Sequence, residues 1–171
     1  MDRQSDLMKD AADQLWSRLQ DGRTGMLWVK SSDDHPQLMT HFGDQDDKAI
    51  WFISSADTDL VQGIAGRPDA GYLFATDKGD YHVSLKGALE VCDDKGKLDE
   101  LWSVAIAAWF ERGRDDPKVR LLRFSPAEAA VWASESNAIL VGWRMVKAAM
   151  NSDATKPDVG RHMIIDFREL V

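Results

Sequence analysis

Apolar and polar residues alternate with a period of two over much of the chain, which is typical of short β-strands. The pattern predicts strands, in chain order, over residues 24–31, 37–42, 49–55, 71–76, 81–91 and 119–133. Turns rich in Gly, Asp and Pro separate them. Most connections are too short for parallel crossovers, so we expect antiparallel pairing.

Two of these runs contain a break that predicts a bend. Gly87 interrupts an alternating run of 81–91, which is typical of a β-bulge. The last strand bends at Ser125-Pro126. Six short strands with such bends are expected to close into a small barrel, because closure removes exposed sheet edges.

A second spacing, of three and four residues, predicts helices over 7–19, 58–65, 98–109 and 138–150. Asp57 or Thr58 is expected to cap the second helix. The chain then divides into an N-terminal helix (1–22), a barrel domain with helices (23–150), and a linker and tail (151–171). The tail segment 161–167 is expected to form an edge strand or a docked tail.

Composition narrows the classes of partner. The 171 residues carry a net charge of −8, which disfavours nucleic acid and anionic membrane surfaces. No apolar run approaches the roughly 20 residues that span a bilayer. The N-terminus is polar and acidic, unlike a secretory signal, and Cys92 is the only cysteine. We therefore expect a cytoplasmic protein, and the histidines show no metal-ligand spacing.

The segment 98–134 holds three of the seven tryptophans beside a charged turn that starts at Gly113. Large aromatic side chains next to such a turn suggest a crevice or a subunit contact. Packing is the alternative interpretation for Trp102, Trp109 and Phe110.

The order of five segments carries a resemblance to a known family. They read TGMLWV, AIWFISSADTD, GYLFA, YHVSLKGALEV and LDELWSVAIAAWFERGRDDPKVRLLRFSPAEAAVWAS. In their order and spacing the chain resembles the pyridoxamine 5′-phosphate oxidase-like family, in its general stress protein branch. The resemblance implies a mainly β protein with flanking helices, a six-stranded antiparallel split β-barrel, and a homodimer. It also implies flavin mononucleotide (FMN) in a cleft at the dimer interface, with low oxidoreductase activity.

The resemblance also implies where the cofactor binds. An Arg is expected near Thr40 or His41, beside Phe42, and a Lys is expected at Asp59 or Leu60, so both phosphate-binding cations are missing. The hydroxyls of Ser54, Ser55 and Thr58 remain. Trp102 and Trp109 would lie close to the cleft.

Several alternatives stay open. His41 is either a ligand contact or a buried structural residue, and Ser54, Ser55 and Thr58 are either turn residues or phosphate donors. The chain is either a flavoprotein or a non-enzymatic binding or stress-response module with a degenerate phosphate site. Oxidation of pyridoxamine phosphate itself is disfavoured, because no second basic cluster is visible along the sequence.

Overall fold

The computed structural model describes residues 3–134, 136–150 and 162–170. Its strands are β1 (Thr24–Val29), β2 (Gln37–Thr40), β3 (Phe42–Asp44), β4 (Ala49–Ser55), β5 (Asp69–Ala75), β6 (Tyr81–Cys92), β7 (Val119–Ala133) and β8 (Met163–Asp166). Its α-helices are α1 (Arg3–Arg18), α2 (Asp59–Gln62), α3 (Lys95–Leu101), α4 (Val104–Ala107) and α5 (Ala138–Met150). Two short 3₁₀ helices are η1 (Gly113–Asp115) and η2 (Phe167–Leu170).

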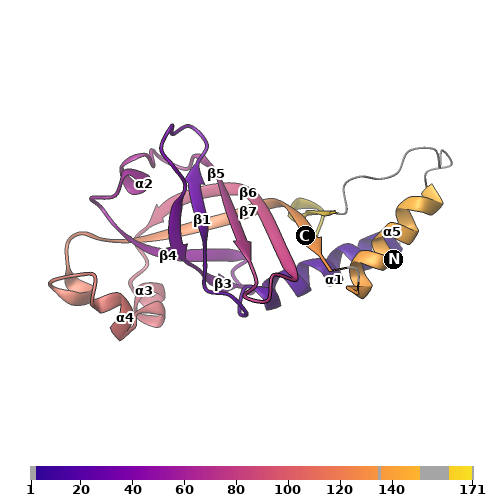
Figure 1. Ribbon diagram of the computed structural model, residues 1–171. Coiled ribbons are helices and arrows are strands. Elements are labelled where there is room, and N and C mark those ends of the chain that lie inside the picture. The colour runs from indigo at the N-terminus through magenta and orange to yellow at the C-terminus, as the bar shows by residue number, and fades with distance from the viewer. Residues whose placement is uncertain (1–2, 135, 151–161, 171) are drawn as a thin grey trace.

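The strands form one antiparallel sheet, as predicted. Neighbouring strands follow the order β2-β1-β5-β6-β7-β4-β3, and β8 pairs with β7 off this path. The sheet curls into a split barrel with flanking helices (Figure 1). The predicted fold class is therefore confirmed.

The predicted number of six strands is wrong, because the run over 37–42 forms two strands. β2 pairs with β1 while β3 pairs with β4, so the chain passes between the two ends of the sheet at His41. The backbone N–H of His41 leaves both ladders and donates to Arg23 O at 2.9 Å. In the tail, β8 pairs with β7 and confirms the edge-strand alternative. The rest of the predicted linker, 151–161, lies outside the described residues.

The bulge predicted at Gly87 is confirmed. The register between β6 and β7 shifts between Lys86 and Gly87, opposite Pro126. A Cβ on Gly87 would lie 2.2 Å from Ser125 O, so only glycine allows the two backbones to approach this closely.

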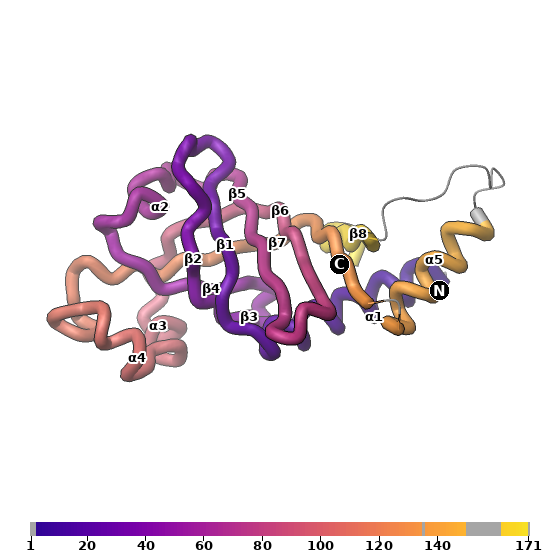
Figure 2. Tube along the Cα trace, in the orientation of Figure 1, coloured from indigo at the N-terminus to yellow at the C-terminus, as the bar shows by residue number. Residues whose placement is uncertain are grey.

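The interior of the barrel is closed by α1, whose apolar stripe was visible in the sequence. In β1, Leu27 and Val29 point inward while Met26 points out. Leu15 and Leu19 of α1 are buried in the same core. At about 1.5–3 kcal/mol for each fully buried large apolar side chain, α1 is an integral part of the domain. α1 also packs against α5 at the end of the molecule opposite α3 and α4 (Figure 2).

The single helix predicted over 98–109 is wrong. The helix breaks at Trp102, whose backbone is extended, and Ser103 caps the start of α4 by accepting a hydrogen bond from the N–H of Ile106 at 3.4 Å. A serine that caps a new turn competes with continuation of the old one. Of the two pieces, α3 covers a second, outer apolar cluster formed by Ala49, Trp51 and Leu121.

The helix predicted over 58–65 is shorter than expected. Thr58 caps α2 as predicted, but the helix ends at Gly63. No helix in the described part of the chain has the length and apolar character needed to cross a bilayer.

Candidate functional site

The residues singled out from the sequence fall into three places. Thr40, His41 and Phe42 lie where β2 leads into β3. Ser54 to Leu60 run from the last residues of β4 into the first turn of α2, and Trp102 and Trp109 flank α4. All of α2, α3 and α4 lie at the same end of the barrel in Figure 1. The elements that carry the last two groups therefore lie at one end of the barrel.

His41 is buried, with 4% of its surface exposed, and both ring nitrogens are engaged within the chain. A carbonyl oxygen only accepts, so the Nε2–H donates to Leu19 O at 2.8 Å. Nδ1 of the neutral ring then accepts from the Tyr72 hydroxyl at 2.6 Å. Burial lowers the pKa of His41 below its ordinary value, which keeps the ring neutral. The geometry favours the structural alternative and leaves neither nitrogen for a ligand.

The two neighbours of His41 differ in exposure. Thr40 is exposed at the end of β2, while Phe42 packs beside the outer cluster, opposite Trp51. Because no cation occupies either position, this crossing offers a phosphate only the hydroxyl of Thr40.

The turn after β4 gathers the hydroxyls that the sequence indicated. Thr58 Oγ1 donates to Ser55 O at 2.9 Å and accepts from Val61 N at 3.2 Å, so its proton is committed to the turn. Ser54 Oγ is 3.4 Å from Thr58 Oγ1. The Ser55 hydroxyl accepts a long bond from Asp57 N at 3.5 Å and finds no acceptor for its own proton among the described residues. Ser55 is therefore the hydroxyl most available to a ligand.

The acidic and apolar positions of this turn do not attract a phosphate. Asp59 is exposed, and Leu60 points into the barrel core with 6% exposure. A side chain at position 60 is therefore not presented at the surface of the turn. The start of α2 adds little, since the helix has four residues.

Two cations that sequence reasoning missed lie beside this turn. Lys118 pairs with Asp57 at 2.9 Å. Arg120 is directly opposite Ser54 in the β4–β7 ladder, so the two side chains share one face of the sheet. Its Nη1 donates to Pro117 O and Val119 O, and no carboxylate of the described chain pairs with it. The register that places Arg120 here depends on long-range strand pairing, which no local sequence signal encodes.

The aromatic pair of the third group is stacked at a tilt. The rings of Trp102 and Phe110 are 5.8 Å apart, and Trp109 is 86% exposed. Val104 on α4 is 90% exposed. Thus Val104 and Trp109, from the segment that was predicted to form one helix, are left uncovered by the described residues.

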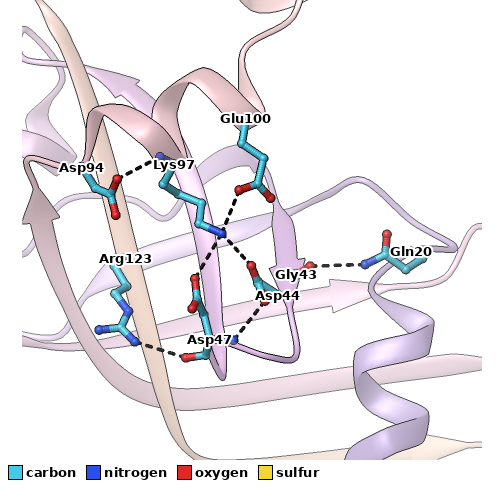
Figure 3. A network of polar contacts seen from close by, with 8 residues as sticks. All are labelled: Gln20, Gly43, Asp44, Asp47, Asp94, Lys97, Glu100 and Arg123. Carbon is cyan, nitrogen blue, oxygen red and sulfur yellow. Dashed lines mark hydrogen bonds and ion pairs between the residues drawn. The ribbon is translucent and has the colours of Figure 1, made fainter.

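A cluster of charges fixes α3 beside this region (Figure 3). Lys97 Nζ lies 2.7 Å from Asp44, 3.1 Å from Asp47 and 3.2 Å from Glu100. The hydrogen bond to Asp44 raises the pKa of Lys97 and lowers that of Asp44. Lys97 is thus committed to holding α3 on the barrel and is no candidate for binding a ligand.

For FMN, the described residues give a partial fit. The ribityl chain and phosphate need hydroxyls and a cation, which Ser54 and Arg120 supply on one face of the sheet, with Ser55 on the other face of β4. The flat ring needs an apolar slot, which the exposed aromatic side chains after α3 begin to form. No group of three or more metal-ligating side chains occurs within the part of the chain that is described.

Comparison with known proteins identifies the class. The family model described as pyridoxamine 5′-phosphate oxidase like matches residues 10–158, so the chain belongs to this family. No curated protein sequence matches the chain.

Three solved structures place it in the general stress branch. General stress protein 26 of Jannaschia sp. CCS1 is 34% identical over 93% of this chain and 99% of its own, with a TM-score of 0.73. A general stress family protein of Xanthomonas campestris pv. campestris is 32% identical over 75% of this chain and 90% of its own, with a TM-score of 0.66. The general stress FMN/FAD binding protein of Xanthomonas citri is 31% identical over 75% of this chain and 92% of its own, with a TM-score of 0.67.

Proposed function

We propose that this chain is a homodimeric, flavin-nucleotide-binding protein of the general stress branch. The single observation that carries the proposal is the pairing of Ser54 with Arg120 across the β4–β7 ladder, beside the Thr58 hydroxyl, at one end of a split barrel. Support also comes from the relative in Xanthomonas citri, which is named for binding FMN or FAD. In this assignment Arg120 takes the role of the cations that are missing at Thr40 and Leu60.

The second copy is inferred from the apolar surface around α4. Val104 and Trp109 are almost fully exposed, more than any other large apolar side chain among the described residues. A second copy would cover them and complete the slot for the flavin ring, next to Trp102 and Phe110. In that case each ligand contacts residues of both chains.

The chemistry of a bound flavin would be redox chemistry, and this chain would supply position and electrostatics. Arg120 would compensate the phosphate charge, and Ser54, on the same face of the sheet, would contribute a hydroxyl. Asp59, exposed beside them, would oppose the phosphate and limit its affinity. More specifically, we propose that the protein with bound flavin is a low-activity oxidoreductase.

The test is a pair of titrations, with FMN and with riboflavin, which differ only in the phosphate. We expect FMN to bind more tightly than riboflavin by about tenfold, a typical effect of one charge-assisted contact of roughly 1.4 kcal/mol. Arg120→Gln should abolish this preference and leave riboflavin affinity unchanged. Asp59→Asn should increase the preference for FMN over riboflavin. Asp77→Asn, in the distant β5–β6 turn, should leave that preference unchanged.

A second candidate is the non-enzymatic module with a degenerate phosphate site. The committed proton of Thr58 and the buried Leu60 favour it, because they remove two groups that the family resemblance led us to expect. A colourless protein that binds neither flavin at high micromolar concentration would establish this alternative and overturn the flavin proposal.

A further inference from the structure

A large groove lies beside α1. It has a volume of about 1050 Å³ and runs between α1 and η2 on one side and β1, β5, β6 and β7 on the other. α1 lies at the end of the barrel away from α3 and α4 (Figure 1). None of residues 54–60, and neither Trp102 nor Trp109, lines it. Its volume is slightly above the range of about 300–1,000 Å³ that is common for small-molecule sites.

The floor of the groove is apolar and flat. Trp28 lies directly over Gly71, where a Cβ would be 2.1 Å from the indole ring, and Gly87 removes a second side chain at the bulge. The surrounding residues are small or apolar: Ala70, Ala88, Pro126, Ala127, Phe167 and Leu170. Such a surface suits the face of an aromatic ring.

The rim of the groove has the opposite charge from the rest of the chain. Six basic side chains line it, against the three acidic residues Asp13, Asp69 and Glu169. Over the whole sequence acidic residues outnumber basic ones, 29 to 21. The basic residues are Lys9, Lys30, Lys48, Arg67, Lys86 and Arg168. They come from different elements, which explains why no basic cluster is visible along the sequence.

Half of these cations have no carboxylate partner. Arg67, Lys86 and Arg168 pair with acidic side chains at 3.9, 3.1 and 2.5 Å. Among the described residues, none forms an ion pair with Lys9, Lys30 or Lys48. A concave site that holds unpaired positive charges above an apolar floor is electrostatically complementary to an anion.

We propose that this groove is a second ligand site, which binds a small organic anion carrying an aromatic ring. The ring lies on the Trp28 floor, and the anionic group contacts the unpaired ammonium groups at the rim. This site is separate from the proposed flavin site, because the two share no residue.

The test uses two probes of similar shape that differ in charge. 8-Anilinonaphthalene-1-sulfonate is an aromatic anion, and N-phenyl-1-naphthylamine is its neutral counterpart; both fluoresce on burial. In the full chain, the double variant Lys30→Glu/Lys48→Glu should weaken binding of the anion at least tenfold. It should change binding of the neutral probe less than twofold. Trp28→Leu should weaken both probes.

The control is Lys78→Glu, an exposed lysine in the β5–β6 turn that does not line the groove. It should change the affinity of the anion less than twofold. Anion affinity that is unchanged in the double variant, or reduced equally by the control, would overturn the proposal. Circular dichroism melting curves identify any variant that fails to fold, and Lys48→Glu alone then replaces the double variant, with a smaller loss expected.

A competition experiment separates this site from the flavin site. Saturating FMN should leave binding of the sulfonate unchanged, and Arg120→Gln should alter only FMN binding. If FMN displaces the sulfonate competitively, the two ligands share one site and the proposal of a second site is wrong. If FMN does not bind at all, the flavin proposal fails while the result for the sulfonate stands by itself.

Discussion

Two neighbouring helices of the same sequence unit have opposite environments. α3 rests on the outer cluster, where Leu98 and Leu101 pack against Trp51. α4, three residues further on, has no residue packed against either apolar cluster, and Val104 is 90% exposed. Both pieces belong to one apolar stripe in the sequence. The difference shows that an apolar stripe predicts that a helix face will be buried. The fold decides whether the same chain supplies the surface that buries it.

The contrast extends to the charges. Above Trp51, Lys97 Nζ is 5.5 Å and the Arg123 guanidinium 5.6 Å from the ring centroid, so two cations cover its π-face. Lys97 in turn meets three carboxylates, as Figure 3 shows. Around α4 no ion pair holds the helix to the barrel within the described residues. α3 is therefore held by apolar packing on the outer cluster and by the ion pairs of Lys97. α4 is held only through the segments that connect it to the rest of the chain.

The largest expected effect on stability comes from removing Trp51, the largest side chain of the outer cluster on which α3 packs. Trp51 is 4% exposed, so Trp51→Ala leaves a cavity and also removes the ring that both cations cover. We expect a loss of about 3–5 kcal/mol in the free energy of unfolding, measured by urea denaturation. A loss below about 1 kcal/mol would mean that α3 is not anchored here and that the contrast with α4 does not hold.

The next largest effect on stability comes from removing the charge of Lys97 on α3. Lys97→Met should cost about 1–2 kcal/mol at pH 7, because three carboxylates then face one another without a cation. Lys95→Met, on the exposed side of the same helix, is the matched control and should cost less than about 0.5 kcal/mol.

The pH dependence of that difference has a defined sign. The hydrogen bond from Lys97 lowers the pKa of Asp44 below its ordinary value of 3.8. A carboxyl with a lowered folded pKa stabilises the fold above its unfolded value, and this contribution disappears as the pH falls through the folded one. The gap between wild type and Lys97→Met should therefore shrink below about pH 4. A gap of equal size at pH 7 and pH 3 would contradict an electrostatic anchor.

The contacts that hold α1 should show a different pH dependence of stability from those that hold α3. His41 connects the end of α1 to Tyr72 as a neutral ring, and burial lowers its pKa from the ordinary 6.5. The unfolded chain therefore binds a proton before the folded chain does, so stability falls as the pH drops below 6.5. One proton gives a slope of at most about 1.4 kcal/mol per pH unit. His41→Gln should flatten this slope between pH 7 and 5, as measured by chemical denaturation; an unchanged slope would assign it to other groups.

Local sequence patterns predicted much of the fold and less of the site. Alternation and glycine placement identified the strands and the bulge at Gly87, because both depend on neighbours in the chain. The division of 37–42 at His41 was not predictable, since it depends on which strand each half pairs with. The break at Trp102 is different, because Ser103 is a local capping signal; the apolar spacing over 98–109 outweighed it in the prediction.

The candidate site divides in the same way. The hydroxyl-rich turn at Ser54 to Thr58 was visible because capping residues have local signatures. Arg120 was not visible, since only the β4–β7 register brings it opposite Ser54. The basic groove was missed for the same reason, as its cations come from helices, strand ends and turns that are distant in sequence.

The smallest effect on the free energy of unfolding is expected at Trp109. This residue also gives the sharpest test of the contrast between the packed helix α3 and the exposed helix α4. Since this ring is 86% exposed, Trp109→Ala should change the free energy of unfolding of the isolated chain by less than about 0.5 kcal/mol. A second copy that covers the ring would make it an interface anchor, and losing such an aromatic residue costs about 2 kcal/mol or more. Sedimentation velocity should then show a dissociation constant raised at least tenfold in Trp109→Ala and unchanged in Lys78→Ala. A wild-type protein that sediments as a monomer at micromolar concentration would show that α4 is simply exposed, because neither this chain nor a second copy covers it.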